Sequence, residues 1–326
     1  MKLKKFKFGY PFFFICIFTF FVFLLLLANL TSTIFSQKTN SSTTKIEDYD
    51  LHVYKKIESK VQGFDRVEML DIEKKFLNGV IRKYKPKKIL EIGVSKGGSS
   101  AIILNAIEDM EDAKLYSVDI SENCYRIPSK KVGFLVEEDF RHLQNKWELH
   151  TGGICANFIE KIGKDIDLCF IDTVHVTPGE MLDILVVLPF LKENAVIVLH
   201  DIGLHFPNAR YKGNYYCDKH SNNQIFAYLK GKKFMPETKE TGNDMFKDIF
   251  FNIGAVELDS NQKDSYFDYF FPLSFHWEYM PDITQLEVTK GLLKKHYEDK
   301  YIKMFEAAIE ANRLLKMPVP TKKVKK

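Results

Sequence analysis

The chain has 326 residues, of which 45% are hydrophobic and 28% charged, so it can hold one large domain with appendages. Its 47 lysines and arginines against 43 acidic residues leave a net charge of +4, and the excess lies in lysines near the two ends, which is typical of solvated tails and gives no sign of a nucleic-acid partner. The five cysteines form no C-x-x-C pair, which argues against a disulfide framework and against a zinc site of the usual spacing.

The N-terminal segment is the most apolar part of the chain. No charged residue occurs from Phe8 to Gln37, and an apolar run of about 20 residues is long enough to span a bilayer. No small-x-small cleavage site follows, so we expect an uncleaved signal anchor at 10–31 more than a cleaved signal peptide, with a basic tail at 1–9 and a polar stalk at 32–47. Because four lysines precede the run, the positive-inside rule predicts a single-pass membrane protein with a cytoplasmic N-terminus and a lumenal or periplasmic catalytic domain.

A helical pattern from Glu47 to Lys83 precedes the stretch KILEIGVSKGGSS, Lys88 to Ser100. An apolar run, a glycine-rich turn and a helical pattern follow one another there, so we expect a strand, a tight turn and a helix of an α/β protein. Glycine lets the backbone approach a ligand closely, and a helix N-terminus offers free N–H groups. A dinucleotide fingerprint needs G-x-G-x-x-G, but Ser95 stands where the second glycine belongs, so the pattern is E-x-G-x-x-x-G from Glu91 to Gly97.

Further apolar segments of strand length follow, separated by helical or polar stretches: Lys114–Ile120, Lys146–Thr151, Asp165–Asp172 and Ala195–Asp201. Strands that alternate with helices predict a doubly wound, mostly parallel sheet. Ligands of such sheets bind at the carboxyl ends of the strands, and acids or histidine stand at four of these ends: Glu91, Asp119, Asp172 and the pair His200–Asp201. An acid after the second strand can accept hydrogen bonds from ribose hydroxyls, which is the role we expect for Asp119.

The last third of the chain has a weaker pattern. Gly203–Asn223 is a polar and aromatic loop that is either a substrate lid or an ordinary surface loop. Phe250–Leu258 is predicted to be a late strand at the sheet edge, and Ile283–Leu315 one or two helices whose apolar residues serve the core or an oligomer interface. We therefore expect a catalytic domain at 48–260 and a helical C-terminal extension with a basic tail at 261–326.

The E-x-G-x-x-x-G pattern resembles motif I of class I S-adenosylmethionine (SAM)-dependent methyltransferases. The tract FIDTVHVTPGEMLDILVVLPFLKENAVIVLHDI, Phe170 to Ile202, resembles a methyltransferase subgroup associated with O-methylation of sugars and small molecules, and more distantly the metal-dependent catechol-type O-methyltransferases. The resemblance covers Ile89 to Ile202 and implies a Rossmann-like fold with a seven-stranded sheet and SAM as cofactor. It implies that SAM is bound by Glu91, Gly93, Gly97, Ser99 and Asp119.

The resemblance to the catechol-type enzymes also suggests how the acceptor is activated. In those enzymes the acid of the fourth strand is a metal ligand, and the residue three positions later is the catalytic base. Carried over, Asp172 becomes a catalytic metal ligand, His175 takes the position of the base, and the ligands of the fifth strand fall on His200 and Asp201. Two carboxylates suit Mg²⁺, whereas the nitrogen of His200 favours Mn²⁺, another transition metal or no metal.

Alternatives stay open for both histidines: His175 is a base or a structural residue bonded to nearby backbone, and His200 is a ligand or a hydrogen-bonding residue that orders the site. We expect a membrane-anchored SAM-dependent methyltransferase that O-methylates a hydroxyl of a sugar, a glycan or a similar small polar acceptor, and that forms a homo-oligomer if the C-terminal helices are an interface. Two other classes remain, a non-catalytic membrane scaffold with this fold and, against the evidence of Ser95, a nicotinamide-dependent oxidoreductase.

Overall fold

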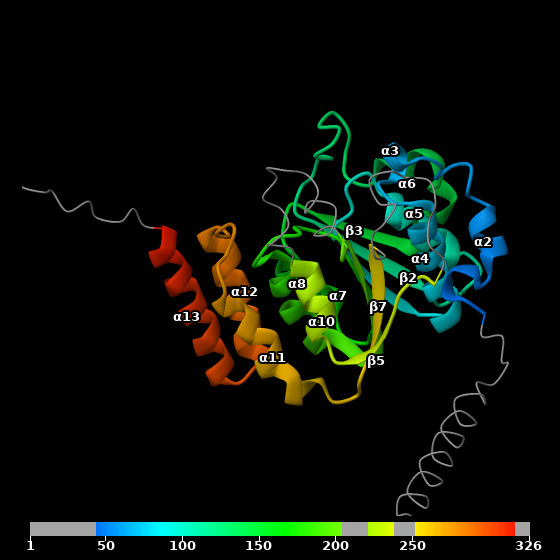
Figure 1. Cartoon of the computed structure of the whole chain (residues 1–326). Helices are drawn as coiled ribbons and strands as arrows, with labels where there is room; N and C mark the ends of the chain where they lie inside the picture. Colours follow the sequence, from blue (N-terminus) through cyan, green and yellow to red (C-terminus); the bar gives the residue numbers. More distant parts are fainter. Residues whose placement is uncertain (1–43, 204–220, 238–251, 317–326) are drawn as a thin grey trace, which may run out of the picture. The chain divides into compact units, whose positions relative to one another are not determined.

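The computed structural model of the chain describes residues 44–203, 221–237 and 252–316, and the described residues from Lys45 onward belong to one compact unit (Figure 1). Its centre is a seven-stranded sheet with the order β3-β2-β1-β4-β5-β7-β6. The strands are β1 (Lys88–Ile92), β2 (Lys114–Asp119), β3 (Trp147–Thr151), β4 (Ile166–Ile171), β5 (Leu191–His200), β6 (Gly231–Phe234) and β7 (Ile253–Leu258). The first five strands are parallel, and β7 and β6 add an antiparallel edge beside β5. The predicted doubly wound, mostly parallel seven-stranded sheet is therefore confirmed.

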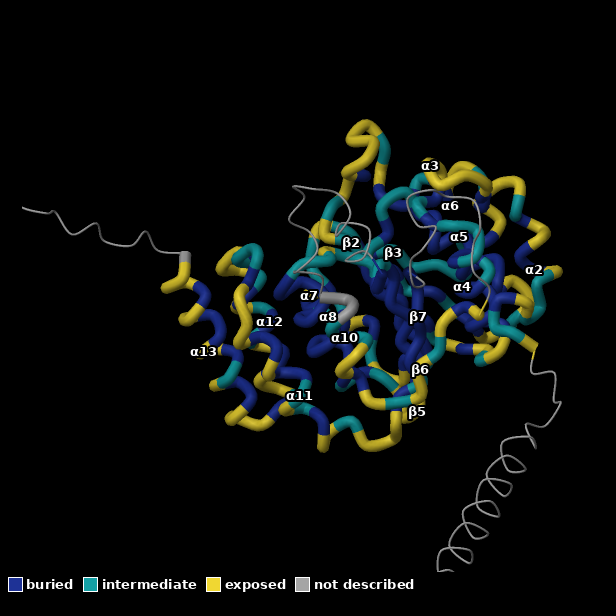
Figure 2. Tube along the Cα trace, in the orientation of Figure 1, coloured by how far each residue is buried: buried dark blue, intermediate teal, exposed yellow. Residues whose placement is uncertain are grey.

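Helices cover both faces of the sheet, so its central strands are buried on both sides (Figure 2). One face packs against helices from the first half of the chain: η1 (Ile46–Asp48), α2 (Leu51–Lys55), α3 (Phe64–Val67), α4 (Asp71–Tyr84), α5 (Gly98–Ala106), α6 (Phe134–Asp139) and η2 (Arg141–Lys146). The other face packs against α7 (Cys155–Ile162), α8 (Gly179–Val187), η3 (Leu188–Phe190), α10 (Ser221–Tyr228), α11 (Tyr266–Phe270), η5 (Phe271–Ser274), α12 (Ile283–His296) and α13 (Asp299–Lys316). The turn η4 (Gln262–Ser265) leads into α11.

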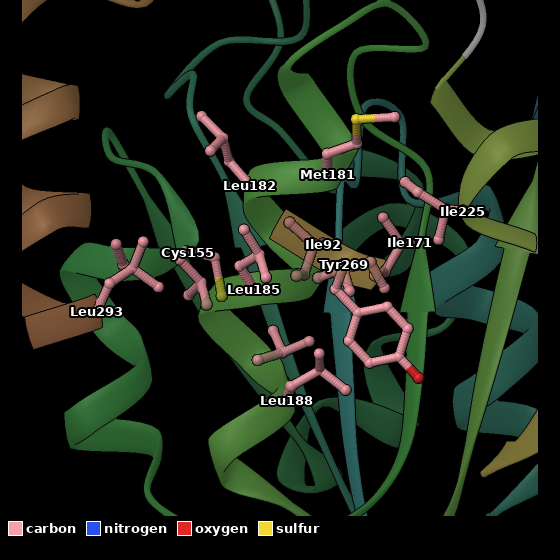
Figure 3. Packing of buried hydrophobic residues seen from close by; sticks show 14 of the residues in the cluster. Ile92, Cys155, Ile171, Met181, Leu182, Leu185, Leu188, Ile225, Tyr269 and Leu293 are labelled. Atoms are coloured by element: carbon pink, nitrogen blue, oxygen red, sulfur yellow. The ribbon is translucent and has the colours of Figure 1, made fainter. Parts of the chain in front are cut away.

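Strand β4 shows how the sequence divides its side chains between the two cores. Leu168 and Phe170 belong to the core beside α4 and α5, whereas Cys169 and Ile171 belong to the core beside α8. Consecutive strand residues point to opposite faces, and a parallel strand covered on both sides is apolar throughout. Figure 3 shows the second core, where Ile92 and Ile171 of the sheet lie near Leu185 of α8.

The prediction of a membrane-spanning N-terminal helix, and with it the single-pass membrane localisation, is corrected. Residues 10–31 lie outside the described residues, and none of the helices at 44–203, 221–237 and 252–316 is long and apolar enough to cross a bilayer. Even α13, with 18 residues, carries charged side chains such as Lys303, Glu306 and Glu310 through its length. Within the described residues, the fold is thus a mixed seven-stranded sheet with a helical C-terminal extension, and no membrane-spanning helix is found among them.

The C-terminal extension packs through its own apolar residues on the helices that cover this face of the sheet (Figure 1). Ile283–Leu315 forms the two helices α12 and α13, and their apolar residues Leu286, Leu292, Leu293, Phe305 and Ala308 are buried in the core beside α8. Trp277, in the segment before α12, is fully buried. Its backbone N–H donates to Asn312 Oδ1 at 2.7 Å, and Asn312 Nδ2 donates to the carbonyl oxygens of Phe275 at 3.2 Å and Ala308 at 3.0 Å. One buried amide thus ties α13 to the segment at 275–277.

We expect Asn312→Ala to lower the free energy of unfolding by about 1–3 kcal/mol, because it leaves the buried N–H of Trp277 without its acceptor. Chemical denaturation monitored by tryptophan fluorescence measures the change. Glu310→Ala, at an exposed position of the same helix, is the matched control and should shift stability by less than about 0.5 kcal/mol. Equal stability of Asn312→Ala and the control would contradict the role of this amide.

Candidate active site

The glycine turn after β1 is fixed by hydrogen bonds to its backbone. Asp119, at the end of β2, accepts hydrogen bonds at Oδ2 from the N–H groups of Val94 and Ser95, both at 3.0 Å, and at Oδ1 from Ser121 N–H at 2.9 Å. Gly93 and Gly97 both have a φ of +91°, a conformation that side chains disfavour. Asp119 of the neighbouring strand therefore fixes the conformation of the turn, as expected of a preformed ligand-binding site.

Glu91 lies under the turn and is fully buried. Its Oε1 accepts a hydrogen bond from Ser99 Oγ at 2.6 Å, and its Oε2 accepts from Ser100 Oγ at 2.7 Å and Ser117 Oγ at 2.6 Å. Burial raises the pKa of Glu91 to about 7, although the three hydroxyls favour the charged form. Glu91 and Ser99 thus join β1 to the start of α5.

The structure brings together all five residues that the sequence predicts to bind the cofactor, since Gly93 and Gly97 form the turn that Glu91, Ser99 and Asp119 surround. Glu91 accepts hydrogen bonds from serine hydroxyls, and Asp119 accepts hydrogen bonds from backbone N–H groups of the turn. Direct contact of either acid with SAM stays a prediction.

The acidic and histidine residues at the ends of β4 and β5 form one cluster. His175 Nε2 lies 2.9 Å from Asp201 Oδ2 and 3.7 Å from Asp172 Oδ1. His200 Nδ1 lies 3.3 Å from Asp172 Oδ2 and 3.4 Å from Asp201 Oδ1. The two carboxylates therefore stand between the two imidazoles and present one oxygen to each. The sequence predicted these four residues, and we name them the strand-end cluster.

Each histidine of the strand-end cluster has a buried glutamate on its other side. Glu180, at the start of α8, places Oε1 3.2 Å from His175 Nδ1 and also accepts the N–H of Thr173 at 3.0 Å. Glu73, in the first turn of α4, places Oε2 3.2 Å from His200 Nε2 and accepts the N–H of Leu70 at 2.6 Å. Sequence analysis missed both glutamates, because an acid in the first turn of a helix is common for local reasons alone.

Burial by itself lowers the pKa of a histidine, but the surrounding carboxylates outweigh it here. Glu180 and Asp201 hold the pKa of His175 well above its usual value, and Asp201, Asp172 and Glu73 do the same for His200. For Asp201, burial raises the pKa, but His200 and His175, with a hydrogen bond from Asn252 Nδ2 at 2.6 Å, bring it well below its usual value. Asn252, just before β7, is a further residue that the sequence did not reveal.

The donor set of the strand-end cluster suits a divalent cation. One ligand atom each from Asp172, His175 and Asp201 lie within 4.8 Å of one another. His200, which the resemblance also makes a ligand, faces the opposite oxygens of the two aspartates. Carboxylate oxygens and an imidazole nitrogen are ordinary ligands of Mn²⁺ and related ions, so the residues fit the metal that the resemblance implies.

The cluster and the glycine turn are adjacent through the backbone. A Cβ added to Gly93 would lie 1.8 Å from the carbonyl oxygen of Asp172, and Asp172 N–H donates to the carbonyl of Ile92 at 2.9 Å. The glycine turn, which we expect to bind the cofactor, therefore lies directly beside the strand-end cluster. Of the loop Gly203–Asn223, which the sequence predicts to be either a substrate lid or an ordinary surface loop, residues 204–220 lie outside the described residues.

The parallel sheet, the glycine turn and the acids at the strand ends define a class I SAM-dependent methyltransferase. Residues 90–202 match the family model of a methyltransferase domain, so the chain carries such a domain and SAM is its cofactor. The match gives no support to a nicotinamide-dependent oxidoreductase.

Among the solved structures that match this chain are two O-methyltransferases. The O-methyltransferase TomG from Streptomyces achromogenes, in complex with SAM, is 16% identical with a TM-score of 0.43, covering 67% of this chain and 93% of that one. The O-methyltransferase from Bacillus cereus, in complex with SAH, is 15% identical with a TM-score of 0.43, covering 70% and 97%. At these values the likenesses support no statement about the site. A search of curated proteins found no match to the sequence.

The raised pKa of Glu91 predicts a pH-dependent stability that Glu91→Gln removes. The folded protein binds the Glu91 proton more tightly than the unfolded chain does, with a pKa of about 7 against 4.5. Between these values the folded state therefore holds more protons, so this residue lowers stability as pH rises, by up to about 3 kcal/mol.

Urea denaturation from pH 4.5 to 7.5 should show wild-type stability falling relative to Glu91→Gln across this range. Glu108→Gln, at an exposed position after α5, should follow the wild type. A constant difference between wild type and Glu91→Gln at all pH values would contradict the shift.

Proposed function

We propose that this methyltransferase transfers the methyl group of SAM to a hydroxyl oxygen of a small polar acceptor, a sugar or a glycan hydroxyl being the kind that its sequence resemblance favours. The single observation that carries the proposal is the contact of Gly93 with Asp172, which puts the strand-end cluster beside the cofactor turn. A hydroxyl held at the cluster is then close to the methyl group of a cofactor bound at the turn. A homo-oligomer stays a prediction.

Methyl transfer from a sulfonium is an in-line displacement, so the site must position the two reactants and remove the hydroxyl proton. Glu91, Gly93, Gly97, Ser99 and Asp119 would bind and orient the cofactor. Asp172 and His175 are the cluster members with the most exposed side chains, 28% and 27%, whereas those of Asp201 and His200 are 15% and 4% exposed. Asp172 and His175 are therefore the residues that an acceptor can reach.

The hydroxyl proton can be removed at this cluster in two ways. His175 accepts it as a general base if Nε2 gives up its own proton to solvent first. Alternatively, Asp172, His175 and Asp201 would hold a divalent cation, which would supply Lewis acidity that lowers the pKa of the hydroxyl, so that its proton can leave to solvent. In both cases Asp201 and Glu180 orient the imidazole of His175 from its two nitrogens.

Asp119→Ala should weaken SAM binding by about 1–3 kcal/mol, because it removes an acceptor of ribose hydroxyls and frees the N–H groups of Val94 and Ser95 that shape the turn. Titration calorimetry of the full chain with SAM, S-adenosylhomocysteine and NAD in turn measures this. Asp112→Ala, at an exposed acid before β2, is the control and should bind SAM as the wild type does. If Asp119→Ala bound SAM as tightly as the wild type, the proposed role of Asp119 in SAM binding would be wrong. If the wild type did not bind SAM, a non-catalytic scaffold would be favoured.

His175→Ala and Asp172→Asn should each slow methyl transfer by about 10²–10⁴-fold while SAM affinity stays unchanged, as expected when acceptor activation is lost. S-adenosylhomocysteine release with a panel of monosaccharides and catechols gives the rate. Lys192→Ala, which removes an exposed partner of Asp167 at the opposite end of the sheet, should retain full activity. Full activity of both cluster variants on an accepted substrate would show that the chemistry lies elsewhere.

A further inference from the structure

The two glutamates behind the strand-end cluster suggest a more specific role for His175. We propose that His175 is a ligand of a divalent transition metal together with Asp172 and Asp201, and that Glu180 and Glu73 are positioning residues that hold this ligand set. The inference rests on the proposed activation of the acceptor at the cluster. It assigns His175 to metal binding in place of proton transfer.

The contacts of Glu180 determine which nitrogen of His175 faces the cluster. Glu180 is fully buried, and its Oε1 is fixed by the N–H of Thr173 at 3.0 Å. A carboxylate oxygen only accepts hydrogen bonds, so His175 Nδ1, at 3.2 Å, is assigned the proton. Once Nε2 has given up its proton, its lone pair points toward Asp172 and Asp201. A histidine that donates its other ring N–H to a carboxylate is the usual arrangement of a metal ligand.

The distances within the cluster agree with one shared cation. His175 Nε2 and Asp201 Oδ2 lie 2.9 Å apart, which is the distance of a hydrogen bond when Nε2 carries a proton, and a bound cation would take the place of that proton. Ligands bound at about 2.1 Å lie about 3.0–3.4 Å from one another in octahedral or tetrahedral geometry. The separation of His175 Nε2 from Asp172 Oδ1 is 3.7 Å, and the three ligand atoms stay within 4.8 Å.

His200 and Glu73 hold the two aspartates from the opposite side. His200 Nδ1 contacts Asp172 Oδ2 and Asp201 Oδ1, which are the oxygens that His175 does not contact. Glu73 contacts the other nitrogen of His200 at 3.2 Å, and both side chains are almost fully buried. The aspartates are thereby turned so that Asp172 Oδ1 and Asp201 Oδ2 face His175. Helix α4 takes part in the site through this single side chain.

A donor set with one imidazole nitrogen binds Mn²⁺ and later transition metals better than Mg²⁺, which prefers oxygen ligands. Mn²⁺ is therefore the probe. Protein stripped with EDTA is titrated with MnCl₂ by calorimetry, and pulsed electron paramagnetic resonance of the bound ion reports whether a ¹⁴N nucleus is coordinated. Neither measurement depends on an acceptor or on turnover.

The wild type should bind one Mn²⁺ with a ¹⁴N coupling, and His175→Ala should lose the coupling. Glu180→Gln and Glu73→Gln should weaken Mn²⁺ binding about 10–100-fold with unchanged SAM affinity, since loss of a partner that orients a ligand has this effect. Asp183→Asn is the matched control: Asp183 lies on the same helix as Glu180 and accepts Thr173 Oγ1 at 2.9 Å. Its Mn²⁺ affinity should stay within about threefold of the wild type.

Three results would overturn the inference: no Mn²⁺ binding by the wild type at millimolar concentration, a bound ion without ¹⁴N coupling or with one that persists in His175→Ala, or equal Mn²⁺ affinities of Glu180→Gln and Asp183→Asn. In each case the proposed function survives if EDTA-treated wild type binds SAM and methylates an acceptor. The proposed function fails separately if SAM does not bind, or if both His175→Ala and Asp172→Asn transfer methyl groups at the wild-type rate.

Discussion

The close approach of Gly93 to the backbone of Asp172 is the constraint on which the site depends. The space for a side chain at Gly93 is occupied by the Asp172 carbonyl, and the N–H of Gly93 donates to the carbonyl of Val118 at 2.9 Å. One residue thus ties the end of β1 to the ends of β2 and β4. Any larger residue would push these strand ends apart, and the glycine turn would separate from the strand-end cluster, where we propose that the acceptor is activated.

The sequence predicted the parts of the site that lie at strand ends, because periodicity locates strands and parallel strands bring their carboxyl ends to one edge. Asp119, Asp172 and His200 were found in this way. Glu73 was not, since it acts on His200 across 127 residues of chain and only the packing of α4 on the sheet brings it there. Asn252 was missed because nothing in the sequence just before β7 indicates that this asparagine contacts Asp201, 51 residues earlier in the chain.

The two groups of buried acids are stabilised in different ways. Glu91 is surrounded by hydroxyls, which hydrogen-bond either protonation state because a hydroxyl both donates and accepts. The strand-end cluster contains two histidines and two aspartates, and Glu73 and Glu180 contact the histidines from behind, so its stability depends on how protons or cations are shared among these groups. The hydroxyl network around Glu91 is suited to supporting the glycine turn in one fixed conformation. The histidines and acids of the strand-end cluster are suited to the proposed uptake of the acceptor proton.

The two sides of the site also differ in which part of the chain supports them. The cofactor turn is held by Asp119 and Glu91, which lie within the methyltransferase-domain match at 90–202. The loop with His175 is held from outside that range, because Thr177 Oγ1 donates to the carbonyl of His276 at 2.8 Å and the Thr177 carbonyl accepts the N–H of Glu278 at 2.9 Å. The C-terminal extension therefore holds the loop with His175, on the side of the site where we propose that the acceptor binds. Substitutions in the C-terminal extension can then alter which acceptor is preferred without changing the glycine turn that we propose binds the cofactor.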